Sequence, residues 1–358
     1  MPIDNPGIIT ALVTAGVDVN ATDQYDNTAL IFAAAHNSNP ETITALIAAG
    51  SDVNATNQYG NTALMIAADR NNNPEIITAL IAAGADVNTT NQYGDTALMV
   101  AAMFSNNPEI ITALVEAGSD VNATDQYGNT ALMAAVMHND NPEIISALVD
   151  AGVDINATNA SGSTALILAV VNNNNPEIIS ALIDAGVDIN VTSASGRTAL
   201  ILAAASNNNP EIISALVEAG SDINATNASG NTALMVAAML NNNPEVIIAL
   251  IDAGANVNMT GRGDMALILA AARSNNLEII TALVVAGVDV NATIDCGCTV
   301  LMHLAWYSDN PEIITTLLEA GADARIRNNA GNTALDFARE NPYIVNSEAF
   351  RRLYEASS

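Results

Sequence analysis

Apolar and polar residues follow a pattern along this chain that recurs every 34 residues. Each unit opens with Thr-Ala-Leu or a variant, runs through alanines and an Asn-rich loop to Asn-Pro-Glu-Ile-Ile, and closes on Ala-Gly-x-Asp-x-Asn. Because one such unit cannot bury its own apolar face, the pattern predicts a solenoid whose units stack into a continuous core. The openings fall at Thr28, Thr62, Thr96, Thr130, Thr164, Thr198, Thr232, Met265, Thr299 and Thr333.

The first half of a unit predicts a short helix. In residues 61–92, Thr62 is a candidate N-cap, and the apolar residues after it follow helical spacing. The alanines at 67 and 68 are small enough to let another helix approach closely. We expect this helix to end at Asn71–Asn73, because asparagine tolerates the left-handed conformation found at many helix exits.

The second half of a unit predicts another helix with stronger start signals. Asn73 is a candidate N-cap, Pro74 suits the first helical position, and Glu75 meets the positive end of the helix dipole. Gly84 should terminate the helix, and residues 86–94 predict a protruding turn built from Asp, Asn, Thr and Gly. The expected buried stripe consists of Ile76, Ile77, Leu80 and Ile81.

These residues resemble the ankyrin repeat. The resemblance departs from the family pattern at Ala63, where proline is usual, at Met65, where histidine is usual, and in the longer Asn-rich loop. It implies an all-α solenoid of stacked helix-loop-helix units with protruding β-hairpin-like turns. The matching positions of the type unit are Gly60, Thr62, Leu64, Ala67, Ala68, Ile76, Ile77, Leu80, Gly84, Ala85, Asp86, Val87 and Asn88.

The predicted organisation has three parts. Residues 1–22 form a partial N-terminal repeat that holds a second helix only, residues 23–324 form nine stacked ankyrin-like repeats, and residues 325–358 form a C-terminal capping repeat. The N-terminal helix, Asn5 to Ala15, has no polar cap. We therefore expect either self-association through this helix or a chain that is the C-terminal part of a longer array.

The charge balance narrows the class of partner. The chain holds 38 acidic residues against nine arginines and no lysine, and its net charge is −29. A field of that sign repels phosphate backbones, which argues against nucleic-acid binding. About half of the acidity recurs in the Pro-Glu and Gly-x-Asp positions, where the fold can use it. A basic protein is a candidate partner for the acidic residues outside these recurring positions.

Targeting signals are not apparent in the sequence. Asp and Asn interrupt every apolar run, so no segment approaches the roughly 18 residues that a membrane helix needs, and no membrane association is expected. Without an export signal the expected location is the cytoplasm by default, and delivery into a host cell stays open. Cys296 and Cys298 are too few for a disulfide framework.

The positions that vary between units are the candidate binding residues. The resemblance implies binding through the hairpin tips and through the two residues after each alanine pair, which line the concave face. The second set is a candidate apolar patch, unless these side chains fold back onto neighbouring repeats. The candidates after the alanine pairs are Met103, Phe104, Met137, His138, Met239, Leu240, Arg273, Trp306 and Tyr307.

Four hairpin tips carry a tyrosine at repeat spacing: Tyr25, Tyr59, Tyr93 and Tyr127. Tyrosine is favoured at contact surfaces, because it offers a large amphipathic area at little cost in side-chain entropy. Tandem duplication explains the same row without selection for binding. Residues 256–307 diverge most from the repeat, which indicates either a binding hot spot or sequence drift.

Catalytic and metal chemistry are not expected. Cys296, Cys298 and His303 offer three ligands at a spacing unlike that of structural zinc sites. No nucleophile with a base and an orienting acid can be assembled, and no phosphate-binding glycine loop occurs. The sequence therefore predicts a non-catalytic protein-interaction scaffold without cofactors. Two alternatives stay open, an acidic decoy or inhibitor of a basic protein, and a structural spacer or fragment of a longer repeat protein.

Overall fold

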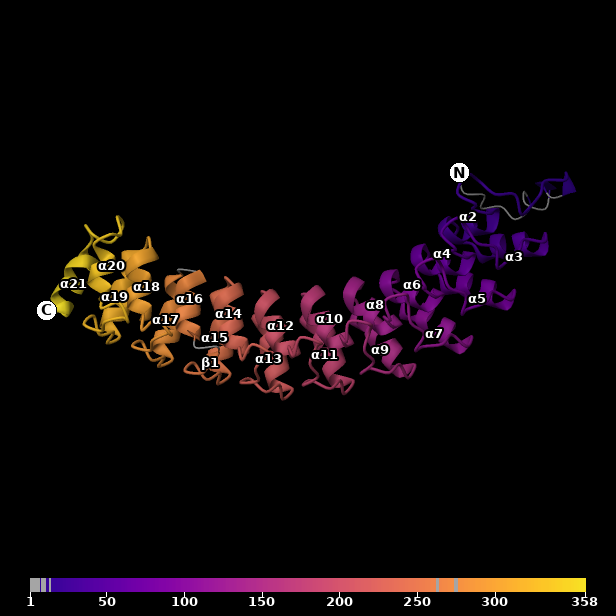
Figure 1. The fold of residues 1–358 in the computed structure, drawn as a ribbon. Helices are drawn as coiled ribbons and strands as arrows, with labels where there is room; N and C mark the ends of the chain where they lie inside the picture. The colour runs from indigo at the N-terminus through magenta and orange to yellow at the C-terminus, as the bar shows by residue number, and fades with distance from the viewer. Residues whose placement is uncertain (1–6, 8–10, 13, 262–263, 274–275) are drawn as a thin grey trace. The chain divides into compact units, whose positions relative to one another are not determined.

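The computed structural model describes the chain except for residues 1–6, 8–10, 13, 262–263 and 274–275 (Figure 1). The predicted N-terminal helix, Asn5 to Ala15, therefore lies largely outside the described residues. The chain divides into two compact units, Met1–Asp188 and Ile189–Ser358. The three-part organisation into residues 1–22, 23–324 and 325–358 stays a prediction.

Each repeat contributes a pair of helices, as the sequence predicts. The first helices are α2 Ala29–His36, α4 Ala63–Arg70, α6 Ala97–Phe104, α8 Ala131–His138 and α10 Ala165–Asn172 in the first unit, and α12 Ala199–Ser206, α14 Ala233–Leu240, α16 Ala266–Arg273, α18 Val300–Tyr307 and α20 Ala334–Ala338 in the second. The second helices are α3 Pro40–Ala48, α5 Pro74–Ala82, α7 Pro108–Glu116, α9 Pro142–Asp150 and α11 Pro176–Asp184, followed by α13 Pro210–Glu218, α15 Pro244–Asp252, α17 Leu277–Val285, α19 Pro311–Glu319 and α21 Glu348–Ser357.

The helices begin where the capping residues predict. The Thr62 hydroxyl accepts a hydrogen bond from the N–H of Met65 at the start of α4. The Asn73 side chain accepts one from the N–H of Glu75, and Pro74 is the first residue of α5. The helix α17 begins at Leu277 without the proline, because Asn276 supplies the same cap. Gly84 has a φ of 92° after α5, in agreement with its predicted role as terminator.

Like helices pack on like helices within each unit. In the first unit α2, α4, α6, α8 and α10 contact one another in sequence, and α3, α5, α7, α9 and α11 form a second layer. The second unit repeats this arrangement from α12 to α20 and from α13 to α21. The core lies between the two layers, where residues such as Ile76, Ile77 and Leu80 are fully buried.

Turns connect each second helix to the next repeat. One of them contains a two-stranded antiparallel hairpin, β1 Thr260–Gly261 and β2 Asp264–Met265. Several others contain a single bridge, such as the one between Thr56 and Thr62. These elements are the hairpin-like turns that the sequence predicts. They protrude from the helical layers (Figure 1).

The prediction for the Asn-rich loop was wrong in one respect. Asn71 follows α4 in an extended conformation, with φ −123° and ψ 113°. In the described part of the chain, Asp26 is the one residue other than glycine with a positive φ. The Asn71 side chain instead donates to the carbonyl oxygens of Ala34 and Asn37 in the preceding repeat, at 3.1 and 2.8 Å. The asparagine therefore forms a bridge between repeats and does not provide a left-handed exit.

Candidate protein-interaction surface

The last turns of the first helices present the residues that follow the alanine pairs. Phe104 is 53% exposed, Leu240 60% and Tyr307 71%. His138 is also exposed, whereas Met103, Met137 and Met239 are half-buried. In the three pairs that contain a methionine, one side chain is thus directed to solvent and one rests partly on its surroundings, whereas Trp306 and Tyr307 are both exposed. For the methionines the interpretation that they fold back onto the protein holds in part.

The hairpin tips hold the four tyrosines in a regular row. Their exposed fractions range from 46% for Tyr59 to 63% for Tyr127. Consecutive tips are joined by main-chain hydrogen bonds, since the N–H of Gln58 donates to the carbonyl of Tyr25, and the N–H of Gln92 to that of Tyr59. The same bonds link the Tyr93 and Tyr127 tips to the next hairpin. The rings therefore stand on a backbone that is fixed from one repeat to the next, which limits the entropy lost on contact.

An aromatic cluster lies at the end of α18. The Trp306 ring packs edge-on against Phe337 of α20 at a centroid distance of 4.8 Å, and its distance to the Tyr307 ring is 6.1 Å. His303 lies 4.9 Å from Tyr307, one helical turn earlier, and burial lowers the pKa of its imidazole. Phe337 was not among the predicted site residues. Phe337 is four residues after Thr333 and so occupies the position that His303 has in the preceding repeat, which gave no signal of a contact with Trp306.

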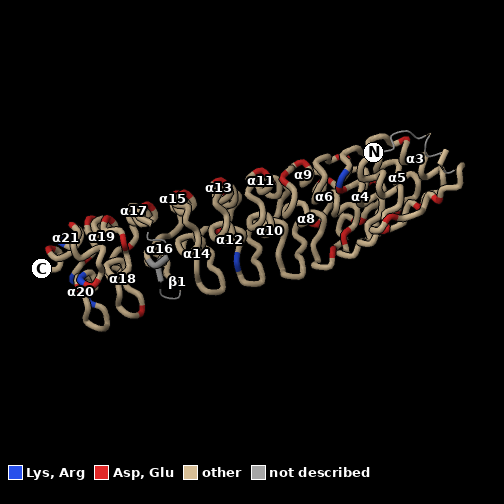
Figure 2. Tube along the Cα trace, turned by 90° about the horizontal axis from the view of Figure 1, so that it is seen from above, with Lys and Arg blue, Asp and Glu red and all other residues tan. Residues whose placement is uncertain are grey.

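The predicted site residues fall on both compact units. Tyr25, Tyr59, Tyr93, Tyr127, Met103, Phe104, Met137 and His138 belong to the first unit, and Met239, Leu240, Arg273, Trp306 and Tyr307 to the second. Arg273 ends α16, and its side chain lies outside the described residues. Figure 2 shows that the hairpins of each unit project on the side of the first helices, away from the second helices.

The recurring acidic residues have structural roles. Asp52 accepts a hydrogen bond from the N–H of Asn54, and its own N–H donates to Asn20 of the preceding repeat. Glu75 and its equivalents stand in the first turn of the second helices, near the positive end of the dipole. Figure 2 shows acidic residues along these helices. These carboxylates have roles within the fold, so their number does not indicate affinity for a basic partner.

One tip carboxylate is unfavourably placed. Burial raises the pKa of Asp95, and the neighbouring charge of Asp125 acts in the same direction. Asn61 and Asn129 occupy the equivalent position in adjacent repeats.

We expect Asp95→Asn to raise the urea midpoint of unfolding at neutral pH, because it removes a half-buried charge. A raised pKa in the folded state means that the carboxylate costs stability only when ionised. The gain should therefore disappear below pH 3.8, where the carboxyl is protonated in both states; a gain that is independent of pH would contradict this explanation.

Cys296, Cys298 and His303 are the three metal ligands that the sequence analysis considered. In the described residues no group of three or more His, Cys, Asp or Glu side chains is arranged to hold a metal ion. The two cysteines are instead joined to each other by a disulfide.

None of the helices in the described part of the chain combines the length and apolar character needed to cross a bilayer.

Stacked helix pairs, protruding hairpins and a surface of variable residues define a helical repeat protein. The sequence matches the family "Ankyrin repeats (3 copies)" over residues 3–91, 66–159, 98–193, 166–261 and 267–357. The chain therefore belongs to the ankyrin-repeat family, whose repeats are generally protein–protein interaction modules. Among curated proteins, no sequence matches this chain.

Proposed function

We propose that this chain is a non-catalytic scaffold that binds a protein partner through the last turns of its first helices and through its hairpin tips. The observation that carries the proposal is the distribution of exposed large apolar side chains. Phe104, Leu240, Trp306 and Tyr307 end first helices, and four exposed tyrosines occupy the tips. Within each of the two units, exposed apolar and aromatic side chains of this kind are typical of interaction sites.

The rigidity of this surface supports the same function. The helices are anchored by fully buried residues such as Leu98 and Ile110, and each of the four tyrosine tips is tied to the next tip by a main-chain hydrogen bond. A partner would therefore meet side chains that are already in position. Such pre-organisation reduces the entropic cost of association.

The acidic decoy is the competing function. It draws support from the net charge of −29, although many carboxylates are engaged in turns and helix starts. The two functions differ in their response to salt. Apolar recognition should persist at high ionic strength, whereas a complex held by charge should weaken steeply.

The test is affinity capture from the native cell, followed by measurement of the dissociation constant for the recovered partner. We expect simultaneous replacement of Met103, Phe104, Trp306 and Tyr307 by alanine to weaken binding at least about thirtyfold, because buried aromatic anchors typically contribute roughly 2 kcal/mol or more. The matched control is Val285→Ala, which removes an 81% exposed apolar side chain from the second helix α17. It should leave binding unchanged.

Three outcomes would contradict the proposal. Unchanged binding by the quadruple variant would place the site elsewhere. Steep loss of the complex in high salt, with equal binding by both variants, would favour the acidic decoy. Failure to recover any partner under mild conditions would favour a structural spacer.

A further inference from the structure

Most hairpin tips share a side-chain cap. In most of the described tips, the side-chain oxygen of the first of five residues accepts hydrogen bonds from the N–H groups of the third and fifth. In one example, Asn57 accepts from Tyr59 and Asn61, at 3.0 and 3.1 Å. This Asx cap closes the turn across its mouth. The residues that form it are Asp23, Asn57, Asn91, Asp125, Asn159, Asn227 and Asn328. At residues 193–197 the first residue is Ser193, whose hydroxyl accepts from the N–H of Arg197 at 3.3 Å.

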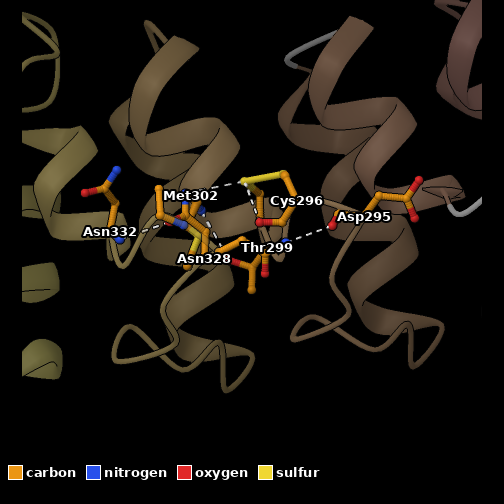
Figure 3. Close-up of a disulfide and its surroundings, with 9 residues drawn as sticks. Asp295, Cys296, Thr299, Met302, Asn328 and Asn332 are labelled. Carbon is orange, nitrogen blue, oxygen red and sulfur yellow. Dashed lines mark hydrogen bonds between the residues drawn. A yellow bond between two sulfur atoms is a disulfide. The ribbon is translucent and has the colours of Figure 1, made fainter.

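The tip at residues 294–298 departs from this design. Its first residue is Ile294, whose side chain has no oxygen to accept a hydrogen bond. The main-chain turn is nevertheless kept, since the N–H of Ile294 donates to Cys298 and the N–H of Gly297 donates to Ile294. The third and fifth residues of this tip are Cys296 and Cys298, and a disulfide joins them (Figure 3). The covalent bond thus connects the two residues that the Asx cap holds together in the Asx-capped tips.

In the cysteine tip, the atom that accepts a hydrogen bond from the next repeat is also different. In several tips that begin with asparagine, the side chain of this first residue donates to the fifth residue of the preceding tip, as Asn57 Nδ2 does to Asn27 Oδ1 at 3.1 Å. Asn328 Nδ2 instead donates to Cys298 Sγ at 3.6 Å. The N–H of Asn329 donates to the carbonyl of Cys296 at 3.0 Å. The disulfide therefore holds both the sulfur and the carbonyl that receive the following repeat (Figure 3).

We propose that Cys296 and Cys298 are a reversible redox pair whose disulfide takes the place of the missing Asx cap. In the oxidised form the bond closes the tip and holds the acceptors for Asn328 and Asn329 in place. In the reduced form this tip has neither a cross-link nor an Asx oxygen. The order of this hairpin and of its contact with the last repeat then depends on the thiol state, independently of the proposed partner.

The oxidation is written with a small disulfide, such as glutathione disulfide, as the oxidant. Cys296 is exposed and Cys298 half-buried, so the Cys296 thiolate makes the first attack. It forms a mixed disulfide with one glutathione and releases the other as a thiolate. The Cys298 thiolate then attacks Cys296 Sγ, forms the internal bond and releases the second glutathione. The two protein thiols are oxidised, one glutathione disulfide is reduced, and the two protons pass to the two released thiols.

The first experiment measures thiol state and order in the full chain. Treatment of the reduced protein with glutathione disulfide should give a monomer that has lost two hydrogens and has no free thiol, as read by mass spectrometry. Amide hydrogen exchange at Gly297 and Asn329 should be about tenfold faster in the reduced form than in the oxidised form. A stable mixed disulfide, a disulfide-linked dimer or equal exchange in the two forms would overturn the proposal.

The matched control restores the cap. Ile294→Asn places at this tip the residue that Asn57 and Asn328 provide elsewhere, and Ile294 is only half-buried. In this variant the exchange of Gly297 and Asn329 should be slow in both thiol states. The double variant Cys296→Ser, Cys298→Ser should exchange like the reduced protein and should not respond to the oxidant. If Ile294→Asn leaves the redox difference intact, the disulfide is not a substitute for the cap and the proposal fails.

Discussion

Replacing Asn139 by alanine is expected to lower the free energy of unfolding by about 3 kcal/mol. Asn139 is 4% exposed, and its Nδ2 donates to the carbonyls of Ala102 and Ser105 in the preceding repeat, at 3.1 and 2.8 Å. Its Oδ1 accepts from the N–H of Asn141 at 2.9 Å. Alanine removes all three bonds and leaves buried polar groups without these partners. Such groups are costly because water cannot replace the lost partner.

The chain provides its own control for Asn139. Ser105 and Ser308 occupy the equivalent position in other repeats, and the Ser105 hydroxyl accepts from the N–H of Asn107. Asn139→Ser should therefore keep the local cap, lose the bridge to Ala102, and cost less than alanine. Urea denaturation followed by circular dichroism measures both variants. An alanine variant as stable as the wild type would show that the bridge contributes nothing net.

Gly94→Ala is the second substitution expected to lower the free energy of unfolding strongly. Gly94 has a φ of 84°, and an added Cβ would lie 2.8 Å from the main-chain nitrogen of Gln126. That nitrogen donates to Tyr93 and ties two tips together. The left-handed conformation costs alanine about 1–2 kcal/mol, and loss of the tip bond should add about 1 kcal/mol. We therefore expect a total loss of about 2–3 kcal/mol in the free energy of unfolding.

Gly118→Ala separates the two contributions to this loss. Gly118 has a φ of 92°, but an added Cβ would meet no atom within 4 Å. This variant should show the conformational cost alone. The comparison uses urea denaturation, together with hydrogen exchange at the Gln126 amide, which should accelerate in Gly94→Ala and not in Gly118→Ala. Equal losses in the two variants would mean that the close approach of consecutive tips is relieved without cost.

Local chemistry made most of the fold predictable. Thr62, Asn73, Pro74 and Gly84 act through bonds or conformations within a few residues, and the structure places the helix ends beside them. The 34-residue period then predicted which faces pack together. Family membership agrees with both.

Contacts between repeats were harder to foresee. Asn71 was predicted to suit a left-handed helix exit. The sequence around an asparagine does not indicate which distant groups its side-chain amide will bond. The partners of Asn71 are carbonyls 37 and 34 residues earlier in the chain. The pairing of Cys296 with Cys298 was missed for a related reason: the sequence shows that Ile294 replaces an Asp or Asn, but only the structure shows that this Asp or Asn caps the tip.

The candidate surface was predictable in composition more than in detail. Sequence variation pointed to Phe104 and Tyr307, which are well exposed, but it could not distinguish them from the half-buried Met103. Which member of a helix-end pair faces solvent depends on the helix of the adjacent repeat. The contact between Trp306 and Phe337 likewise joins two repeats, so it cannot be predicted from the sequence of a single repeat.

The asparagine bridges bear on how such an array can grow. Asn71 and Asn73 satisfy carbonyls of the repeat before them, and Asn54 donates to Gly84 of the repeat after it. A gene segment that copies one whole period therefore supplies every donor and acceptor that both new junctions require. Insertion of part of a period would leave one junction without its counterparts, so the chemistry of the junction favours lengthening in whole periods.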